Sequence, residues 1–213
     1  KPYMTEDIPV ERFVTALPEL SVLMAWTKIV LADELLASEL PDDHYLDLDL
    51  RAYFPAQIRE GFESQVTDHP LRREIIVTQV VNDLVNGAGM TYWPRLAGET
   101  GADAADLTRA NFVAREIFAS LPLREEVRAF DNVLEASTQT RMRLEMRTLV
   151  ERASRWLVSN RRPPLDSQVT VDFFAAAVQR TMAQLPDLMV GRELAAYEDR
   201  RKALVAQQVP EEL

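Results

Sequence analysis

Apolar residues recur at intervals of three and four positions along most of this sequence, and no other feature constrains the fold as strongly. The first such stripe comprises Leu20, Leu23, Met24, Leu31 and Leu35, and the last comprises Val171, Phe174, Val178, Met182 and Leu185. This spacing places side chains on one face of a helix. No hairpin turn joins two runs of alternating apolar and polar residues. We therefore expect an all-α fold without a sheet, a compact bundle of roughly eight to ten helices.

Prolines, glycines and capping residues set the expected helix ends. Pro18 and Pro70 suit the first turn of a helix, where the missing N–H of proline has no partner to lose. Asp103, with an acidic residue three positions later, suits an N-cap, and so does Thr170. We expect helices over residues 18–40, 54–68, 71–86, 90–100, 103–119, 123–136, 138–160, 170–185 and 186–207.

The 213 residues fit one domain or one and a half, at roughly 150 residues per domain. We expect a lead-in from an upstream domain over residues 1–17, a main helical domain over 18–162, and a C-terminal helical pair over 163–213 that packs on it. The chain starts with Lys1 instead of methionine. This start predicts a piece of a longer protein.

Composition excludes several classes of function. The chain has no cysteine, so disulfides, thiolate metal sites and thiol nucleophiles are all excluded. Such a composition fits a reducing compartment, and we expect the cytoplasm. No uninterrupted apolar stretch approaches the roughly 20 residues that cross a bilayer, so no membrane partner is expected.

Four acidic residues, Asp42, Asp43, Asp47 and Asp49, crowd one turn after Pro41. Oxygen ligands suit magnesium, and one alternative is therefore a self-contained helical metal-dependent enzyme that uses Asp42, Asp43 and Asp47. No second acidic motif faces the cluster. The favoured interpretation is a solvated acidic turn without a metal.

Histidine and glycine motifs give weak signals for chemistry. The two histidines, His44 and His69, lie in turns without a catalytic partner nearby in sequence, so we expect surface or capping roles. Gly87 and Gly89 superficially resemble a phosphate-binding loop, but they follow a predicted helix and lack the third glycine of a dinucleotide site. We expect a helix C-cap there. No catalytic, cofactor-binding or metal residue is predicted.

Arginines are concentrated in residues 141–162, which hold seven of them and two glutamates, whereas residues 1–50 carry a net charge of −8. The seven are Arg141, Arg143, Arg147, Arg152, Arg155, Arg161 and Arg162. A second alternative is a nucleic-acid-binding helical module, in which these arginines neutralise phosphates. The overall charge of −10 opposes it, so we expect no nucleic-acid partner. We favour arginines that bridge carboxylates, with Trp156 anchoring the apolar side of the helix.

Lys28 is one of only three lysines and lies between Trp26 and Ile29. A partly buried ammonium needs a partner, and we expect the side chain to reach Asp33, Glu34 or solvent. The candidate interdomain or ion-pair contacts of the chain are Lys28, Arg147, Arg152, Arg155 and Trp156.

Seven stretches carry a distinctive residue order. They are LPELSVLMAWTKI at 17–29, DELLASELPDD at 33–43, YFP at 53–55, HPLRREII at 69–76 continuing to VNDLVNG at 81–87, ETGA at 99–102, VAREIF at 113–118 and ERASRWL at 151–157. In this order they resemble the C-terminal region of the large bacterial class of NAD-specific glutamate dehydrogenases.

The resemblance implies a parent enzyme that converts L-glutamate, NAD and water to 2-oxoglutarate, ammonia and NADH. It also implies that the catalytic residues and the NAD site lie upstream, so no catalytic residue is carried over and no cofactor is expected in this fragment. The expected partners are the upstream catalytic domain of the same chain and further copies of the parent in a homo-oligomer. The fragment itself is predicted to be inactive and to support the catalytic core, its assembly or its regulation.

Overall fold

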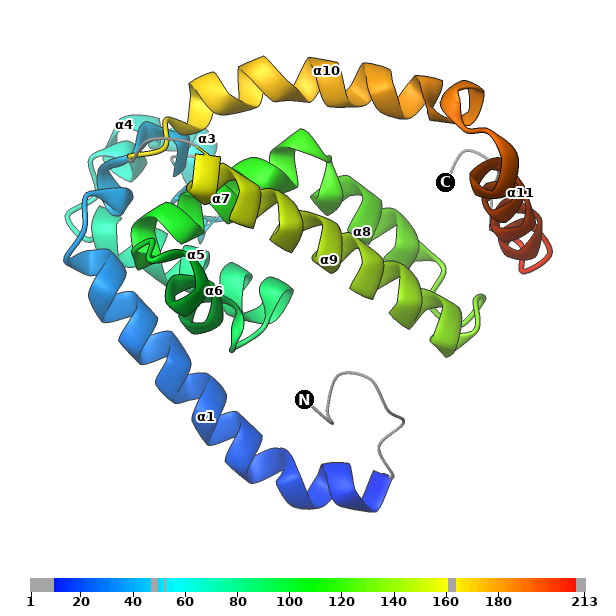
Figure 1. Ribbon diagram of the computed structural model, residues 1–213. Coiled ribbons are helices and arrows are strands. Elements are labelled where there is room, and N and C mark those ends of the chain that lie inside the picture. The colour runs from blue at the N-terminus through cyan, green and yellow to red at the C-terminus, as the bar shows by residue number, and fades with distance from the viewer. Residues whose placement is uncertain (1–9, 47–49, 52, 161–163, 210–213) are drawn as a thin grey trace. The chain divides into compact units, whose positions relative to one another are not determined.

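The computed structural model describes residues 10–46, 50–51, 53–160 and 164–209. These residues are mostly helical and contain no strand, which confirms the all-α prediction (Figure 1). They divide into two units, one up to Gly98 and one from Glu99. Each unit is described by itself below. The three-part domain organisation expected from the sequence stays a prediction.

The first unit is built around two long helices, α1 and α5. Its described elements are α1 (Val10–Leu36), the short 3₁₀ turns η2 (Leu40–Asp42) and η3 (His44–Leu46), α3 (Ala56–Gly61), α4 (Glu63–Thr67), α5 (Arg72–Ala88) and most of α6 (Tyr92–Thr100). Helix α1 packs on α5, and η2 packs on both. This arrangement gives the unit a core made largely from two helix faces.

Helix α5 is rich in β-branched residues that would also suit a strand. It nevertheless forms a single helix and buries Ile76, Val80 and Leu84 on successive turns. Leu31 and Leu35 of α1 are fully buried as well. Each buried side chain of this size contributes about 1.5–3 kcal/mol. The predicted helix over 71–86 is therefore confirmed, with its end two residues later.

The predicted bounds of the first helix are wrong at both ends. Helix α1 begins at Val10, so Pro18 lies inside it. A proline inside a helix removes one backbone hydrogen bond, and the remaining turns sustain the helix here. The helix ends at Leu36 because Ser38 competes for the backbone: its hydroxyl donates to Leu35 O at 2.7 Å and accepts from Leu40 N at 3.1 Å.

The segment 54–68 forms two short helices where the sequence predicts one. Ile58, Phe62 and Val66 have the spacing of one helical face, but only Val66 is buried. Phe62 leaves the helical conformation, with φ −138° and ψ 43°, directly after Gly61. This break separates α3 from α4 and leaves Ile58 and Phe62 exposed.

The second unit contains the last five helices. They are α7 (Ala104–Ile117), α8 (Ser120–Ala129), α9 (Ala136–Asn160), α10 (Ser167–Leu188) and α11 (Gly191–Val205). Helix α7 packs on both α9 and α10 (Figure 1). Its Ala110, Val113, Ala114 and Ile117 form the core with Val150, Leu157 and Leu165, and Val171, Phe174 and Val178 of α10 pack against that core.

Small residues allow α7 and α9 to approach closely. Ser154 of α9 is fully buried, and its hydroxyl donates to Val150 O at 2.7 Å and lies 3.4 Å from Ala110 O on α7. Because Ala110 is also fully buried, a larger side chain at either position would displace a helix.

Helix starts in the second unit follow the capping rules, but not always at the predicted residue. Asp103 caps α7 as predicted, since its carboxylate accepts from Asp106 N at 2.8 Å. The predicted cap at Thr170 is wrong: Asp166 accepts from Val169 N at 2.9 Å and α10 begins at Ser167. The hydroxyl of Thr170 instead donates to Asp166 O, inside the first turn.

The boundaries of three further helices differ from the prediction. Helix α8 spans Ser120–Ala129 instead of 123–136, and it starts directly after Ala119, which has a left-handed φ of 47°. Pro186 lies inside α10 instead of opening the last helix. Helix α11 opens at Gly191, whose φ of 59° reverses the chain after α10. The predicted end of the helix over 138–160 is confirmed, since α9 ends at Asn160, and residues 161–163 lie outside the described residues.

Candidate functional site

Lys28 links α1 to α5. Its ammonium donates to Asn82 Oδ1 at 2.8 Å in a partly buried position. On a helix, position 28 shares a face with Leu31 and Leu35, which are buried. The side chain therefore reaches Asn82 instead of the expected Asp33 or Glu34, both of which are exposed. A role for Lys28 in an interdomain contact stays a prediction.

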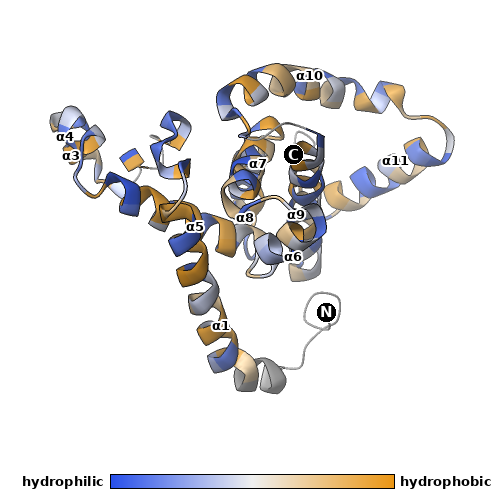
Figure 2. Ribbon diagram, turned by 60° about the vertical axis from the view of Figure 1, so that its left-hand side comes forward, coloured by the Kyte–Doolittle hydropathy of each residue, from blue (hydrophilic) through white to orange (hydrophobic). Residues whose placement is uncertain are grey.

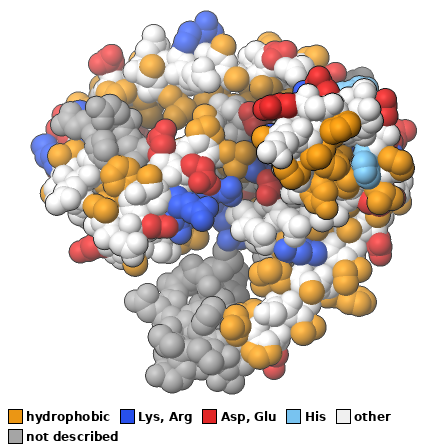
Figure 3. Space-filling model, turned by 180° about the vertical axis from the view of Figure 1, so that it is seen from behind, with side chains coloured by type: hydrophobic (Ala, Val, Ile, Leu, Met, Phe, Trp, Pro, Cys, Tyr) orange, Lys and Arg blue, Asp and Glu red, His pale blue; other side chains and the backbone are white. Residues whose placement is uncertain are grey.

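The opposite face of α1 carries large apolar side chains that no other described element of the first unit covers. Val22 is 70% exposed, Trp26 is 64% exposed and Ile29 is 54% exposed. We call these three residues the α1 ridge. Figure 2 shows that hydrophobic residues make up much of α1, and Figure 3 shows hydrophobic side chains along it at the lower right. Sequence reasoning missed this ridge, because the same helical period runs through the buried face of α1.

The acidic turn is held by hydrogen bonds and an ion pair of the chain itself. Asp42 pairs with Arg73, which also donates to Leu36 O and Ser38 O at 2.9 Å each. Asp43 accepts from Tyr45 N at 2.9 Å. Both carboxylates therefore fix the path of the chain between α1 and α5.

Metal binding at this turn gains no support from the described carboxylates. In the part of the chain that the structure describes, no group of three or more His, Cys, Asp or Glu residues could hold a metal ion. Asp47 and Asp49 of the predicted acidic cluster lie outside the described residues. The engagement of Asp42 with Arg73 favours the structural interpretation of the turn.

His69 and Gly89 lie just before and just after α5. His69 Nδ1 accepts from Leu71 N at 3.1 Å just before α5, and its ring lies 5.6 Å from that of Phe54. Gly89 follows the last turn of α5 with a φ of 96°, as predicted for a C-cap, and Gly87 lies within the helix. A pyrophosphate needs the N–H groups of a helix N-terminus, and these glycines sit at the opposite end. They do not fit the NAD phosphates.

A surface groove of the first unit is lined by Arg51, Arg59, Glu60, Glu63 and Val66. Arg51 and Glu63 form an ion pair of 2.8 Å within this set. The two arginines and two glutamates of the lining therefore balance, and the groove has no net charge that would attract a charged ligand.

Arginines of α9 bridge carboxylates, as the sequence predicts. Arg155 donates to Glu99 Oε2 from Nη2 at 2.6 Å and from Nε at 3.2 Å. Arg143 pairs with Asp131 at 3.1 Å. A further fork, from Arg200 of α11 to Glu145 of α9, has distances of 3.0 and 3.1 Å.

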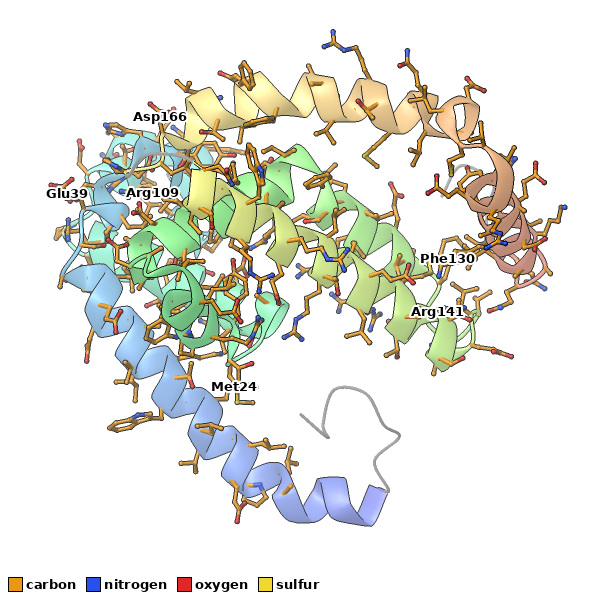
Figure 4. All side chains as sticks on the ribbon, in the orientation of Figure 1. Met24, Glu39, Arg109, Phe130, Arg141 and Asp166 are labelled. Carbon is orange, nitrogen blue, oxygen red and sulfur yellow. The ribbon has the colours of Figure 1, made fainter. Side chains whose placement is uncertain are left out.

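The remaining α9 arginines differ in their surroundings. Arg147 also takes part in an interaction within the chain. Arg152 and Arg141 are exposed, and Figure 4 labels Arg141 at the start of α9. Arg161 and Arg162 lie outside the described residues. Two of the seven arginines, Arg143 and Arg155, thus pair with carboxylates of the chain, which does not favour the nucleic-acid alternative.

Trp156 lies at the edge of the second unit instead of anchoring it. Its side chain is 49% exposed, and its ring meets Phe174 of α10 edge-on at 5.8 Å. Val150 and Leu157 provide the buried contacts of α9 that were expected of Trp156.

A buried carboxylate connects the start of α7 to the start of α10. Burial raises the pKa of Asp106, and the neighbouring Asp103 raises it further, while Arg109 and a hydrogen bond from the backbone of Leu165 oppose these effects. The Arg109 guanidinium lies 3.6 Å from the Asp106 carboxylate. Figure 4 labels Arg109 and Asp166 at this end of the unit. The sequence identified Asp106 only as the acidic residue that follows a cap.

Comparisons with known proteins agree on one family. Residues 15–213 match the family model described as glutamate dehydrogenase, C-terminal. The NAD-specific glutamate dehydrogenase of Halomonas elongata is 36% identical over 197 residues, and that of Mycobacterium tuberculosis is 36% identical over 196. The enzyme of the same name from Pseudomonas aeruginosa is 35% identical over 193 residues.

Each alignment covers nearly all of this chain but only a small part of the relative. They take in 91–92% of this chain, but the chain spans only 12% of the length of each relative.

Among the helices that the structure describes, none is both long and apolar enough to cross a membrane.

Proposed function

The chain belongs to the glutamate dehydrogenase C-terminal family, and from this premise we propose that it is the non-catalytic helical domain of an NAD-dependent glutamate dehydrogenase. In the intact enzyme, L-glutamate, NAD and water would yield 2-oxoglutarate, ammonia and NADH. The single observation that carries the proposal is the coverage: almost all of this chain matches 12% of each relative. The rest of such a protein would house the NAD site and the catalytic residues.

Inactivity of the chain alone is supported by how its polar groups are used. Asp42 is paired with Arg73, and His69 caps the approach to α5. Arg155 is held by Glu99. A group that already holds the fold is poorly placed to move a proton or bind a substrate. We infer that these residues position helices instead of reacting.

The proposed role is to support the catalytic core, its assembly or its regulation. The proposed partners are the catalytic part of the same polypeptide and further copies of the intact enzyme in a homo-oligomer. The absence of cysteine supports a reducing compartment, and we propose the cytoplasm.

Two assays test this proposal. The purified 213-residue chain, mixed with glutamate and NAD, is expected to form no NADH. The intact dehydrogenase shortened so that it ends before Lys1 is expected to lose activity or to change its number of subunits. Turnover by the isolated chain would contradict the non-catalytic role. A shortened enzyme with full activity and unchanged assembly would contradict the supporting role.

A further inference from the structure

We propose that the α1 ridge is the binding surface for an amphipathic helix from the catalytic part of the same dehydrogenase. The apolar stripe of that helix would be flanked by basic residues. This inference rests on the proposed function and adds to it the surface and the chemistry of the partner. The ridge consists of Val22, Trp26 and Ile29, all more than half exposed.

The spacing of the ridge fits a helix as its partner. Residues 19, 22, 26, 29 and 33 alternate in steps of three and four, which is the spacing of a coiled-coil seam. At 1.5 Å per residue, the apolar part extends about 10 Å and the whole stripe about 21 Å. A stripe of this length matches two to four turns of a facing helix better than it matches a sheet.

The other side of α1 is already occupied. Leu31 and Leu35 are fully buried where α1 packs on α5, and Lys28 bonds Asn82 on that side. The ridge is therefore a second apolar face on the same helix. A helix with apolar residues on both sides is normally covered on both sides.

The acidic residues at the ends of the ridge favour a partner helix with basic residues. Glu19 and Asp33 are exposed and stand at the two ends of the ridge. In an antiparallel pair of two α1 helices, Glu19 would face Asp33 of the other copy. In a parallel pair, each carboxylate would face its own counterpart. Both arrangements oppose like charges, so the ends disfavour a second α1 and favour Lys or Arg.

The length of the relatives indicates where the partner helix comes from. The matched segment is 12% of each relative, so a partner helix from the remainder would be permanently tethered to α1. Tethering raises the effective concentration of such a helix to the millimolar range. A weak seam of two to four turns would then be occupied without a separate binding protein.

Photo-crosslinking of the intact dehydrogenase identifies the occupant. The crosslinking residue p-benzoylphenylalanine replaces Trp26, and the crosslinked peptide is sequenced by mass spectrometry. We expect one peptide from the catalytic part of the enzyme, with an apolar stripe flanked by Lys or Arg. A crosslink to residues 99–213 of this chain, to α1 of a second copy or to an unrelated protein, or the absence of any crosslink, would overturn the proposal.

Substitutions in the intact enzyme test the chemistry of the seam. Val22→Glu and Trp26→Glu should each increase the rate at which a protease releases the C-terminal segment by about tenfold, as expected when a central contact is lost. Ser21→Glu adds the same charge on α1 away from the ridge and is the matched control. Rates within twofold of this control would overturn the proposal.

Two further measurements separate the causes of any effect. The Glu19→Lys, Asp33→Lys double variant should also speed release, because its new charges would face basic residues. The isolated chain carrying Trp26→Glu should keep its urea midpoint, which shows that the fold is intact. If shortening the enzyme abolishes activity while the ridge variants behave like the control, the proposed function stands and this inference fails.

Discussion

The contact between Lys28 and Asn82 should contribute measurably to the packing of α1 on α5. The ammonium donates at 2.8 Å in a partly buried position. A hydrogen bond to a charged group is worth about 1.5–3 kcal/mol when water is excluded. Partial exposure of Lys28 reduces this value. We therefore expect a coupling free energy of about 1 kcal/mol between the two side chains.

A double-mutant cycle measures this coupling. The variants are Lys28→Met, Asn82→Leu and the pair together, and the assay is urea unfolding followed by circular dichroism. Because Asn82 is neutral, the coupling should persist at about 0.5 M salt, where ion pairs between exposed groups are screened. The matched control is the cycle of Lys28→Met with Asp33→Asn, which should give a coupling near zero. A larger coupling with Asp33 than with Asn82, or one that salt removes, would refute the reasoning.

Variants at three positions test the second unit. Because the pKa of Asp106 is raised in the folded chain, the protonated form is favoured by folding, so this group's contribution to stability is present at low pH and is lost as pH rises through the folded pKa. The urea midpoint of Asp106→Asn relative to the parent chain should therefore rise between about pH 4 and pH 7, and a fall would contradict the sign. Ser154→Leu should destabilise the unit by about 1–3 kcal/mol in thermal unfolding because it overfills the α7–α9 contact, whereas Ser154→Ala should cost less than about 1 kcal/mol. Equal midpoints for the two Ser154 variants would show that the contact is loose. Asp166→Ala should destabilise α10 by about 1 kcal/mol while Asp166→Asn should retain the cap, and a loss of the same size in both would argue against capping.

Rules that act within one turn of the chain predicted most of the secondary structure. Asp103 caps α7 because its side chain reaches an N–H three residues away, a relation visible in the sequence. The segment between Pro70 and Gly87 is also a helix as predicted, although it holds many β-branched residues, because it is longer than an ordinary strand. Local rules failed where two residues could serve equally: Asp166 and Thr170 are both capping types, and only the chain path shows which reaches the free N–H.

The candidate site depends on contacts that span long stretches of sequence. The partner of Lys28 lies 54 residues away, and no spacing rule connects them. Trp26 and Leu31 belong to the same helix and are both apolar, so the periodic pattern could not show that one is exposed and the other buried. The same applies to Trp156 and Leu157, where the larger neighbour is the exposed one.

A structure of the intact dehydrogenase with NAD and glutamate bound is the most direct test of the role assigned to this chain. We expect both ligands to contact only residues outside the 15–213 segment that matches the family model. In that structure these helices would form a separate body beside the catalytic core. A contact of either ligand with a side chain of this segment would contradict the account.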